Sequence, residues 1–128
     1  NCAQSVLSAF VGEYGFDASQ ALTMASGFGA GMGRLQETCG AVTGAYMVIG
    51  IHNDSRHEGN ESKEATIDMI QQFSKDFREM HGTTSCSELQ NCDLRTKEGQ
   101  DQFEKLGLHA QVCEKCVRSS VNILGRIL

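Results

Sequence analysis

Residues 27–50, GFGAGMGRLQETCGAVTGAYMVIG, decide how we expect the chain to fold, because a glycine-rich segment leads directly into a small-residue helix. Thr38 is a good N-cap, since its hydroxyl can accept a backbone N–H of the first helical turn. This cap puts Cys39 at the first helical position, beside the positive end of the helix dipole, where a thiol is biased towards thiolate. The small residues behind it form a narrow face that another helix can approach: Gly40, Ala41, Gly44 and Ala45. The stretch predicts a central helix that presents a cysteine at its start.

Helical periodicity continues on both sides of this stretch, with apolar residues three or four positions apart. The longer segments predicted as helices are 2–14, 18–26, 61–80 and 109–128. Ser85 and Glu88 match a capping box, which puts Cys86 at the first position of a short helix, and Thr96 caps another through Lys105. No segment alternates at period two, and no repeat or linker divides the chain. We therefore expect residues 1–128 to form one all-α domain, a compact bundle of about five to six helices with a glycine-rich loop.

Two further expectations concern residues around these helices. Residues 52–60, HNDSRHEGN, are polar and predict a loop in which His52 and His57 are exposed to solvent. The last helix is expected to bury one row of side chains at three- and four-residue spacing. That row is Cys113, Val117, Val121, Leu124 and Leu128.

The net charge of the 128-residue chain is −5. An acidic chain is a poor match for nucleic acid or an acidic membrane surface. The most apolar run, residues 39–51, is shorter than the roughly 20 residues that a membrane-spanning helix needs. We expect no membrane insertion and a cytoplasmic location, although the chain begins at Asn1 rather than Met, which leaves room for a removed leader.

The alternating glycines at 29, 31 and 33 are the first candidate binding feature. Their spacing fits neither the dinucleotide fingerprint nor a P-loop, which requires Gly-Lys-Ser/Thr, and no strand precedes them. They predict a backbone with positive φ that passes close to another group. We assign Gly29, Gly31 and Gly33 as candidate cofactor-binding residues, the neighbouring group being a cluster or a partner chain.

Six cysteines in 128 residues are too many to be explained only as small buried side chains. An iron–sulfur cluster is one interpretation, since such clusters take cysteines from one fold. Zinc is a second, because Cys113 and Cys116 form a C-x₂-C pair and His109 lies one helical turn earlier. Disulfides or redox-active thiols are a third. Ordinary buried thiols with no cofactor are the fallback.

Three familiar cysteine chemistries are excluded. The Cys113–Cys116 pair lies inside a predicted helix without a preceding strand, unlike the thioredoxin motif. Val117 follows Cys116 where covalent haem attachment requires histidine. No residue is identifiable that would orient His81 towards Cys86, so a cysteine hydrolase has no support. The sequence assigns no catalytic residue.

The order of these motifs resembles the C-GCAxxG-C-C family of redox-active proteins over nearly the whole chain. The matching segments are NCAQ at 1–4, GMGR at 31–34, ETCGAVTGAYMVIG at 37–50, Cys86 with Glu88-Leu89, Cys92-Asp93-Leu94, and Cys113 with Val117. The name motif reads Gly-Cys-Ala, whereas this chain has Cys39-Gly40-Ala41, with the first two residues exchanged. Related domains occur in split-Soret cytochromes c, where the resemblance implies a small helical iron–sulfur domain.

The resemblance implies that four cysteines converge as metal ligands of an iron–sulfur cluster or as redox thiols: Cys2, Cys39, Cys86 and Cys113. Cys92 and Cys116 are the reserve cysteines, which would take the place of any of these four that is wrongly chosen. The implied function is one-electron transfer to a redox partner protein, with N–H···S hydrogen bonds tuning the potential. The alternative is a non-enzymatic helical interaction module stabilised by zinc or disulfides. The small-residue face and the methionines would also suit a homodimer.

Overall fold

The computed structural model describes residues 1–128, and its regular elements are all helical, with a single isolated β-bridge between Thr38 and Ser85 and no strand. The all-α prediction is confirmed. The α-helices are α1 (Cys2–Ser8), α2 (Ala18–Ala25), α3 (Gly29–Met32), α4 (Gly40–Arg56), α5 (Gly59–His81), α6 (Cys86–Gln90), α7 (Lys97–Lys105) and α8 (Glu114–Ile127). Short 3₁₀ turns cover Val11–Tyr14 and Ser26–Phe28, and a π-helical turn, His109–Cys113, leads into α8. No helix is both long and apolar enough to cross a membrane.

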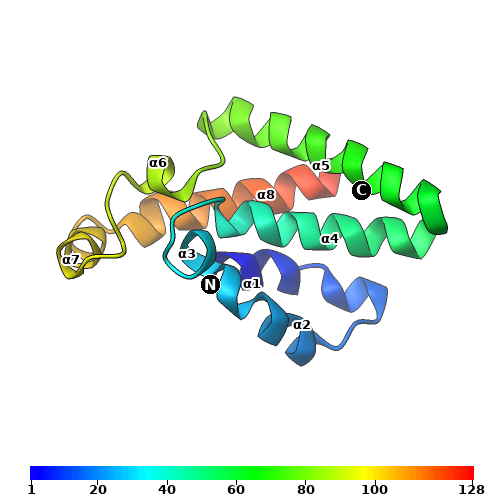
Figure 1. Cartoon of the computed structure of the whole chain (residues 1–128), viewed down its shortest axis with the longest axis horizontal. Helices are drawn as coiled ribbons and strands as arrows, with labels where there is room; N and C mark the ends of the chain where they lie inside the picture. Colours follow the sequence, from blue (N-terminus) through cyan, green and yellow to red (C-terminus); the bar gives the residue numbers. More distant parts are fainter.

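Three long helices, α4, α5 and α8, lie side by side and pack against one another (Figure 1). Helix α1 packs against α4 and α8 on the opposite side from α5, and α2 packs against α1. The short helices α6 and α7 lie at one end of the long helices, on the same side as α3 (Figure 1). Phe73 and Phe77 of α5 are fully buried and stack with ring centroids 6.1 Å apart. The core therefore lies between the long helices, and the site described below lies at the end that α3, α6 and α7 close.

The small-residue face of α4 is used inside the chain. A Cβ added at Gly44 would lie 2.7 Å from the carbonyl oxygen of Ala3, and one at Gly40 would lie 3.1 Å from its backbone nitrogen. The separation at Gly44 is too short for a real Cβ and the one at Gly40 is tight, so glycine at position 44 is what lets α1 approach α4 this closely. The close approach predicted from residues 40–45 is present, and α1 occupies the face that we had considered for a second copy.

The expectation of a loop at residues 52–60 is wrong. Helix α4 continues to Arg56, and α5 begins at Gly59 after two linking residues. His52 is only 5% exposed, and its Nδ1 lies 2.9 Å from the hydroxyl of Tyr14, so it is not solvated, whereas His57 is exposed as expected. Asn53 is also buried and donates to the Ile49 carbonyl at 3.1 Å. These polar side chains stay helical because partners satisfy them.

Two other helices differ from the pattern drawn from the sequence. The first helix ends at Ser8, and a 3₁₀ turn replaces the remainder of the predicted segment 2–14. Of the predicted row, Cys113 and Leu124 are buried, whereas Val117, Val121 and Leu128 are only half-buried. Helix α8 instead buries Cys116, Ser120 and Ile123. The buried face of α8 is thus rotated from the predicted row, and the two valines stand at its edge.

Candidate cysteine centre

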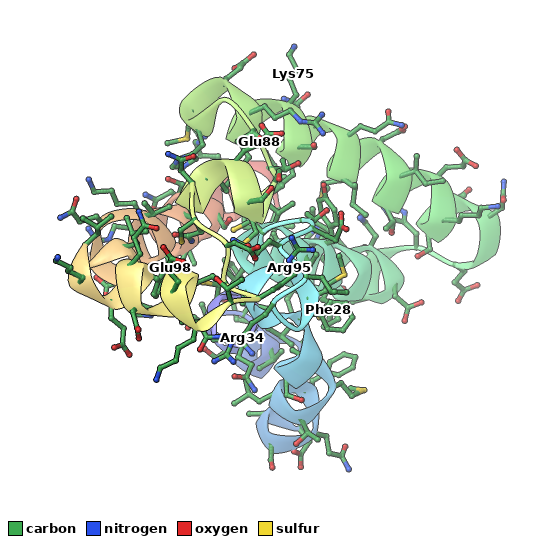
Figure 2. The ribbon with its side chains drawn as sticks, turned by 60° about the vertical axis from the view of Figure 1, so that its left-hand side comes forward. Phe28, Arg34, Lys75, Glu88, Arg95 and Glu98 are labelled. Carbon is green, nitrogen blue, oxygen red and sulfur yellow. The ribbon has the colours of Figure 1, made fainter.

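Four cysteines from separate parts of the chain line one cavity of about 170 Å³. They are the four that the sequence singled out: Cys2, Cys39, Cys86 and Cys113. Cys2 opens α1, Cys39 precedes α4, Cys86 opens α6 and Cys113 ends the π-helical turn. Figure 2 looks towards this end of the molecule, where the exposed Arg34 and Arg95 lie on the outer surface near α6 and α7. The fold therefore gathers into one place side chains that lie up to 111 positions apart, from Cys2 to Cys113.

Cys39 is itself the N-cap of α4, so the expectation that Thr38 caps this helix is wrong by one position. The backbone at this point is fixed by the adjacent segment, because Cys39 N–H donates to the Thr84 carbonyl at 2.8 Å. The pKa of Cys39 is lowered, chiefly by a hydrogen bond from the Cys116 thiol and further by the N–H groups of Ala41 and Val42. The first turn of α4 thus favours a thiolate at the cavity wall.

Cys113 has the most acidic thiol of the group. Its sulfur accepts hydrogen bonds from the Cys2 thiol and from Gln90 Nε2, the latter at 2.8 Å. These bonds, with the Cys2 contribution largest, lower the pKa of Cys113 to about 6 although burial opposes the change. The same hydrogen bond raises the pKa of Cys2, which keeps its own proton and donates it to the Cys113 sulfur.

Cys86 is at the start of α6 with Ser85 as N-cap, as predicted, but the capping box is only half formed, because the Ser85 N–H donates to Thr83 Oγ1 and not to Glu88. Ser85 is the N-cap and accepts the backbone N–H of Glu88 at 3.5 Å, and Cys86 N–H donates to the Glu37 carbonyl at 2.7 Å. Burial, followed by the neighbouring Cys39 and Cys113, raises the pKa of Cys86 to about 12. A hydrogen bond from Gln36 opposes this rise and offers an N–H to the sulfur.

Only one of the three assigned glycines lines the cysteine cavity. Gly31 and its neighbour Ala30 do so, both with left-handed φ values of +67° and +52°. A Cβ at Gly31 would lie 2.7 Å from the Cβ of Cys86, which only glycine avoids. Gly29 instead packs on the Asn1 side chain, and Gly33 ends the turn with φ +66°. Left-handed backbone in a residue such as Ala30 is strained, and strain of this kind concentrates at functional sites.

The two reserve cysteines do not line the cavity. Cys116 is fully buried behind Cys39, and the hydrogen bond to Cys39 raises its pKa. Cys92 lies in the turn after α6, half-buried, and its backbone carbonyl accepts from Gln36 Nε2 at 2.7 Å. All six cysteines are free thiols.

Sequence reasoning missed several residues of the cavity wall. Gln90 is buried, and its Oε1 has no hydrogen-bond partner although its Nε2 donates to Cys113. Leu94 and Phe103 supply apolar wall, and His109 lies at the edge. Nothing in the local pattern distinguishes Gln90 from other polar residues on short helices, whereas His109 was noticed only for its spacing from Cys113.

The cavity has an unusual balance of charge. It is lined by four sulfurs but by no lysine or arginine, so His109 is the only side chain there that could carry positive charge. Gln90, Gln36 and the start of α4 direct N–H groups at three of the sulfurs. No group of three or more His, Cys, Asp or Glu side chains is arranged to hold one metal ion. The four cysteines line one cavity without forming a single-ion site.

Comparison with known proteins gives one finding. The model of a family described as "Putative redox-active protein (C_GCAxxG_C_C)" matches residues 1–127. Neither a curated protein nor a solved structure gives a significant match.

Proposed function

The chain belongs to the C_GCAxxG_C_C family, and from that premise we propose that it carries single electrons through an iron–sulfur cluster held by Cys2, Cys39, Cys86 and Cys113. The observation that carries this proposal is the single cavity lined by these four cysteines. Iron–sulfur clusters are held by cysteine thiolates, commonly four of them. The four cysteines line a cavity and do not form a group that could hold one metal ion. A cluster fills a volume, whereas the ligands of one zinc ion meet at a point, so the cluster is the better match.

The charge of the site also supports a bound iron–sulfur cluster. Thiolates gathered in a buried space repel one another, and burial without a positive partner is costly. The wall supplies no lysine or arginine to offset that charge, whereas iron would supply it. The N–H groups directed at Cys39, Cys86 and Cys113 would disperse what negative charge remains.

A cluster bound here would supply a one-electron couple whose potential depends on hydrogen bonds to sulfur and on exposure to solvent. The chain's own residues set both quantities. Gln90 donates to the Cys113 sulfur, and Leu94 and Phe103 restrict water on the α6–α7 side. Gly31 lets the backbone of the glycine-rich segment pass beside Cys86. We further propose that electrons pass to and from a redox partner protein in the cytoplasm, where thiols stay reduced.

The test is isolation of the protein under argon, followed by measurement of its iron, acid-labile sulfide and visible spectrum. We expect iron and sulfide in stoichiometric amounts and visible absorption that bleaches reversibly on reduction by dithionite. Colourless protein that contains no iron, and that stays colourless after anaerobic incubation with ferrous iron and sulfide, would defeat this proposal.

A second candidate function rests on the hydrogen-bonded pairs Cys2–Cys113 and Cys39–Cys116, each of which joins one thiol of lowered pKa to one of raised pKa. Such a pair resembles a redox dithiol. Oxidation would form one S–S bond and release two protons and two electrons to the disulfide of a partner protein, which becomes two thiols. Iron-free protein that loses two or four free thiols on oxidation, and regains them with reductant, would favour this candidate.

A further inference from the structure

A second and larger cavity, of about 560 Å³, lies between α1 and the start of α8 and adjoins the cysteine cavity. The two share Asn1, Cys2, His109 and Cys113 as wall residues. The larger cavity has the volume of a small-molecule site, typically about 300–1,000 Å³. The rest of its wall is Ser5, Glu114, Val117, Arg118, Val121 and Asn122.

One wall of this cavity follows the surface of α8. Cys113, Val117 and Val121 are four residues apart and form one row along the helix. At a rise of about 1.5 Å per residue, this row extends about 12 Å from the sulfur end to Val121. The half-buried valines make an apolar strip, and the cavity therefore runs from the cysteine centre outwards.

Only some of the polar side chains in the wall have an ion-pair or hydrogen-bond partner within the protein. Glu114 lies opposite His109, with Oε1 3.6 Å from Nδ1, so the one carboxylate of the wall has a partner. Arg118 takes part in neither ion pair of the molecule and in no side-chain hydrogen bond. The hydroxyl of Ser5 and the carboxamide of Asn122 likewise have no protein partner. A free guanidinium with two neutral polar groups nearby is a typical arrangement for recognition of a carboxylate.

We propose that this cavity binds a small organic anion, with its carboxylate on Arg118, its aliphatic part along Val117 and Val121, and its far end beside Cys2 and Cys113. The inference concerns binding alone and goes beyond the proposed function, because it does not depend on whether the cysteine centre holds a cluster. The unpaired arginine selects the negative charge, and the two valines select an apolar body over inorganic phosphate.

Calorimetric titration of the protein as isolated with hexanoate, a carboxylate on a short aliphatic chain, tests the binding. Hexanamide has the same chain without the charge and is the matched ligand control. We expect hexanoate to bind at least about tenfold more tightly than hexanamide, because only hexanoate offers the Arg118 guanidinium a charged hydrogen-bond acceptor. Arg118→Gln should weaken hexanoate binding by a similar factor, and Arg118→Lys should weaken it less.

Arg126→Gln, on the same helix but outside this cavity, is the control variant and should bind hexanoate like the unaltered protein. Val121→Phe should block both ligands, since it fills the apolar strip without altering charge. Equal binding of hexanoate and hexanamide, unchanged binding in Arg118→Gln, or no binding at millimolar hexanoate would overturn the inference. Iron content is measured separately, so a protein with iron but no hexanoate site refutes this inference alone, and one with the site but no iron refutes only the cluster.

Discussion

Replacing Gly31 by alanine tests whether the glycine-rich segment positions Cys86. Gly31 has φ +67°, and a Cβ there would lie 2.5 Å from Gln36 Cα and 2.7 Å from Cys86 Cβ. Gly33 has nearly the same φ, +66°, but its Cβ would meet nothing closer than the Gly27 carbonyl at 4.0 Å. The two glycines thus share a backbone conformation and differ in the space around them.

The expected losses of stability follow from this comparison of Gly31 with Gly33. The left-handed conformation costs alanine about 1–2 kcal/mol at either position. Gly31→Ala additionally overfills the space beside Cys86, at a cost of about 1–3 kcal/mol. We therefore expect Gly33→Ala to lower the free energy of unfolding by about 1–2 kcal/mol and Gly31→Ala to lower it by about 2–5 kcal/mol.

Urea unfolding followed by circular dichroism measures both variants under the same conditions. Bound iron, measured on the folded variants, shows whether Cys86 has moved, and we expect Gly31→Ala to lose more iron than Gly33→Ala. Equal losses of stability at the two positions would mean that no contact between residue 31 and Cys86 exists, and the reasoning would be refuted.

Three other perturbations have defined outcomes. Gln90→Leu removes the N–H that lies 2.8 Å from the Cys113 sulfur, so the reduction potential measured by redox titration should fall. Gln102→Leu, at an exposed position of α7 outside the cavity wall, should leave the potential unchanged, and equal potentials in both variants would contradict this role of Gln90. Burial lowers the pKa of His52 below 6.5, so below pH 6.5 the unfolded chain takes up a proton that the folded chain does not. The urea midpoint should therefore fall as pH drops from 7 to 5, and it should fall less in His52→Gln than in the unaltered protein; an equal fall in both would contradict this account of His52. A Cβ at Gly99 would overlap the Asp93 carbonyl, so Gly99→Ala should displace α7 and speed alkylation of Cys86 in iron-free protein. Gly125→Ala is the control, because a Cβ at Gly125 meets open space, and it should leave the alkylation rate of Cys86 unchanged. An unchanged rate in Gly99→Ala would show that α7 does not cover the site.

The central helix was predictable because its determinants are local. Small residues at 40, 41, 44 and 45 let α1 approach, and this requirement is visible in the chain itself. The cap of that helix was misplaced by one residue because the Thr84 carbonyl, 45 positions away from Cys39, fixes the backbone. No local pattern contains such a bond.

The same difference between local and long-range determinants explains why the loop expected at residues 52–60 is helical. His52 and Asn53 read as solvated polar residues, but Tyr14 and the Ile49 carbonyl satisfy them within the fold. At the site, each cysteine could be selected from helix-start patterns and family motifs. Gln90 could not, because its importance comes only from lying 2.8 Å from a sulfur 23 positions away.

The redox assignment itself depends on the family match together with the gathering of four sulfurs around one space. The roles of Cys92 and Cys116 follow from their positions outside that space. Cys116 is a buried neighbour of Cys39, and Cys92 shapes the turn before α7 through its backbone.

The most direct measurement of the central claim is the iron bound per chain in six single Cys→Ser variants, each isolated under argon and checked for helical content. The account predicts that substitution of Cys2, Cys39, Cys86 or Cys113 removes or sharply reduces bound iron, while Cys92→Ser retains it in full and Cys116→Ser retains most of it. Iron that depends on Cys92 as strongly as on Cys86, or that is indifferent to all four cavity cysteines, would contradict it.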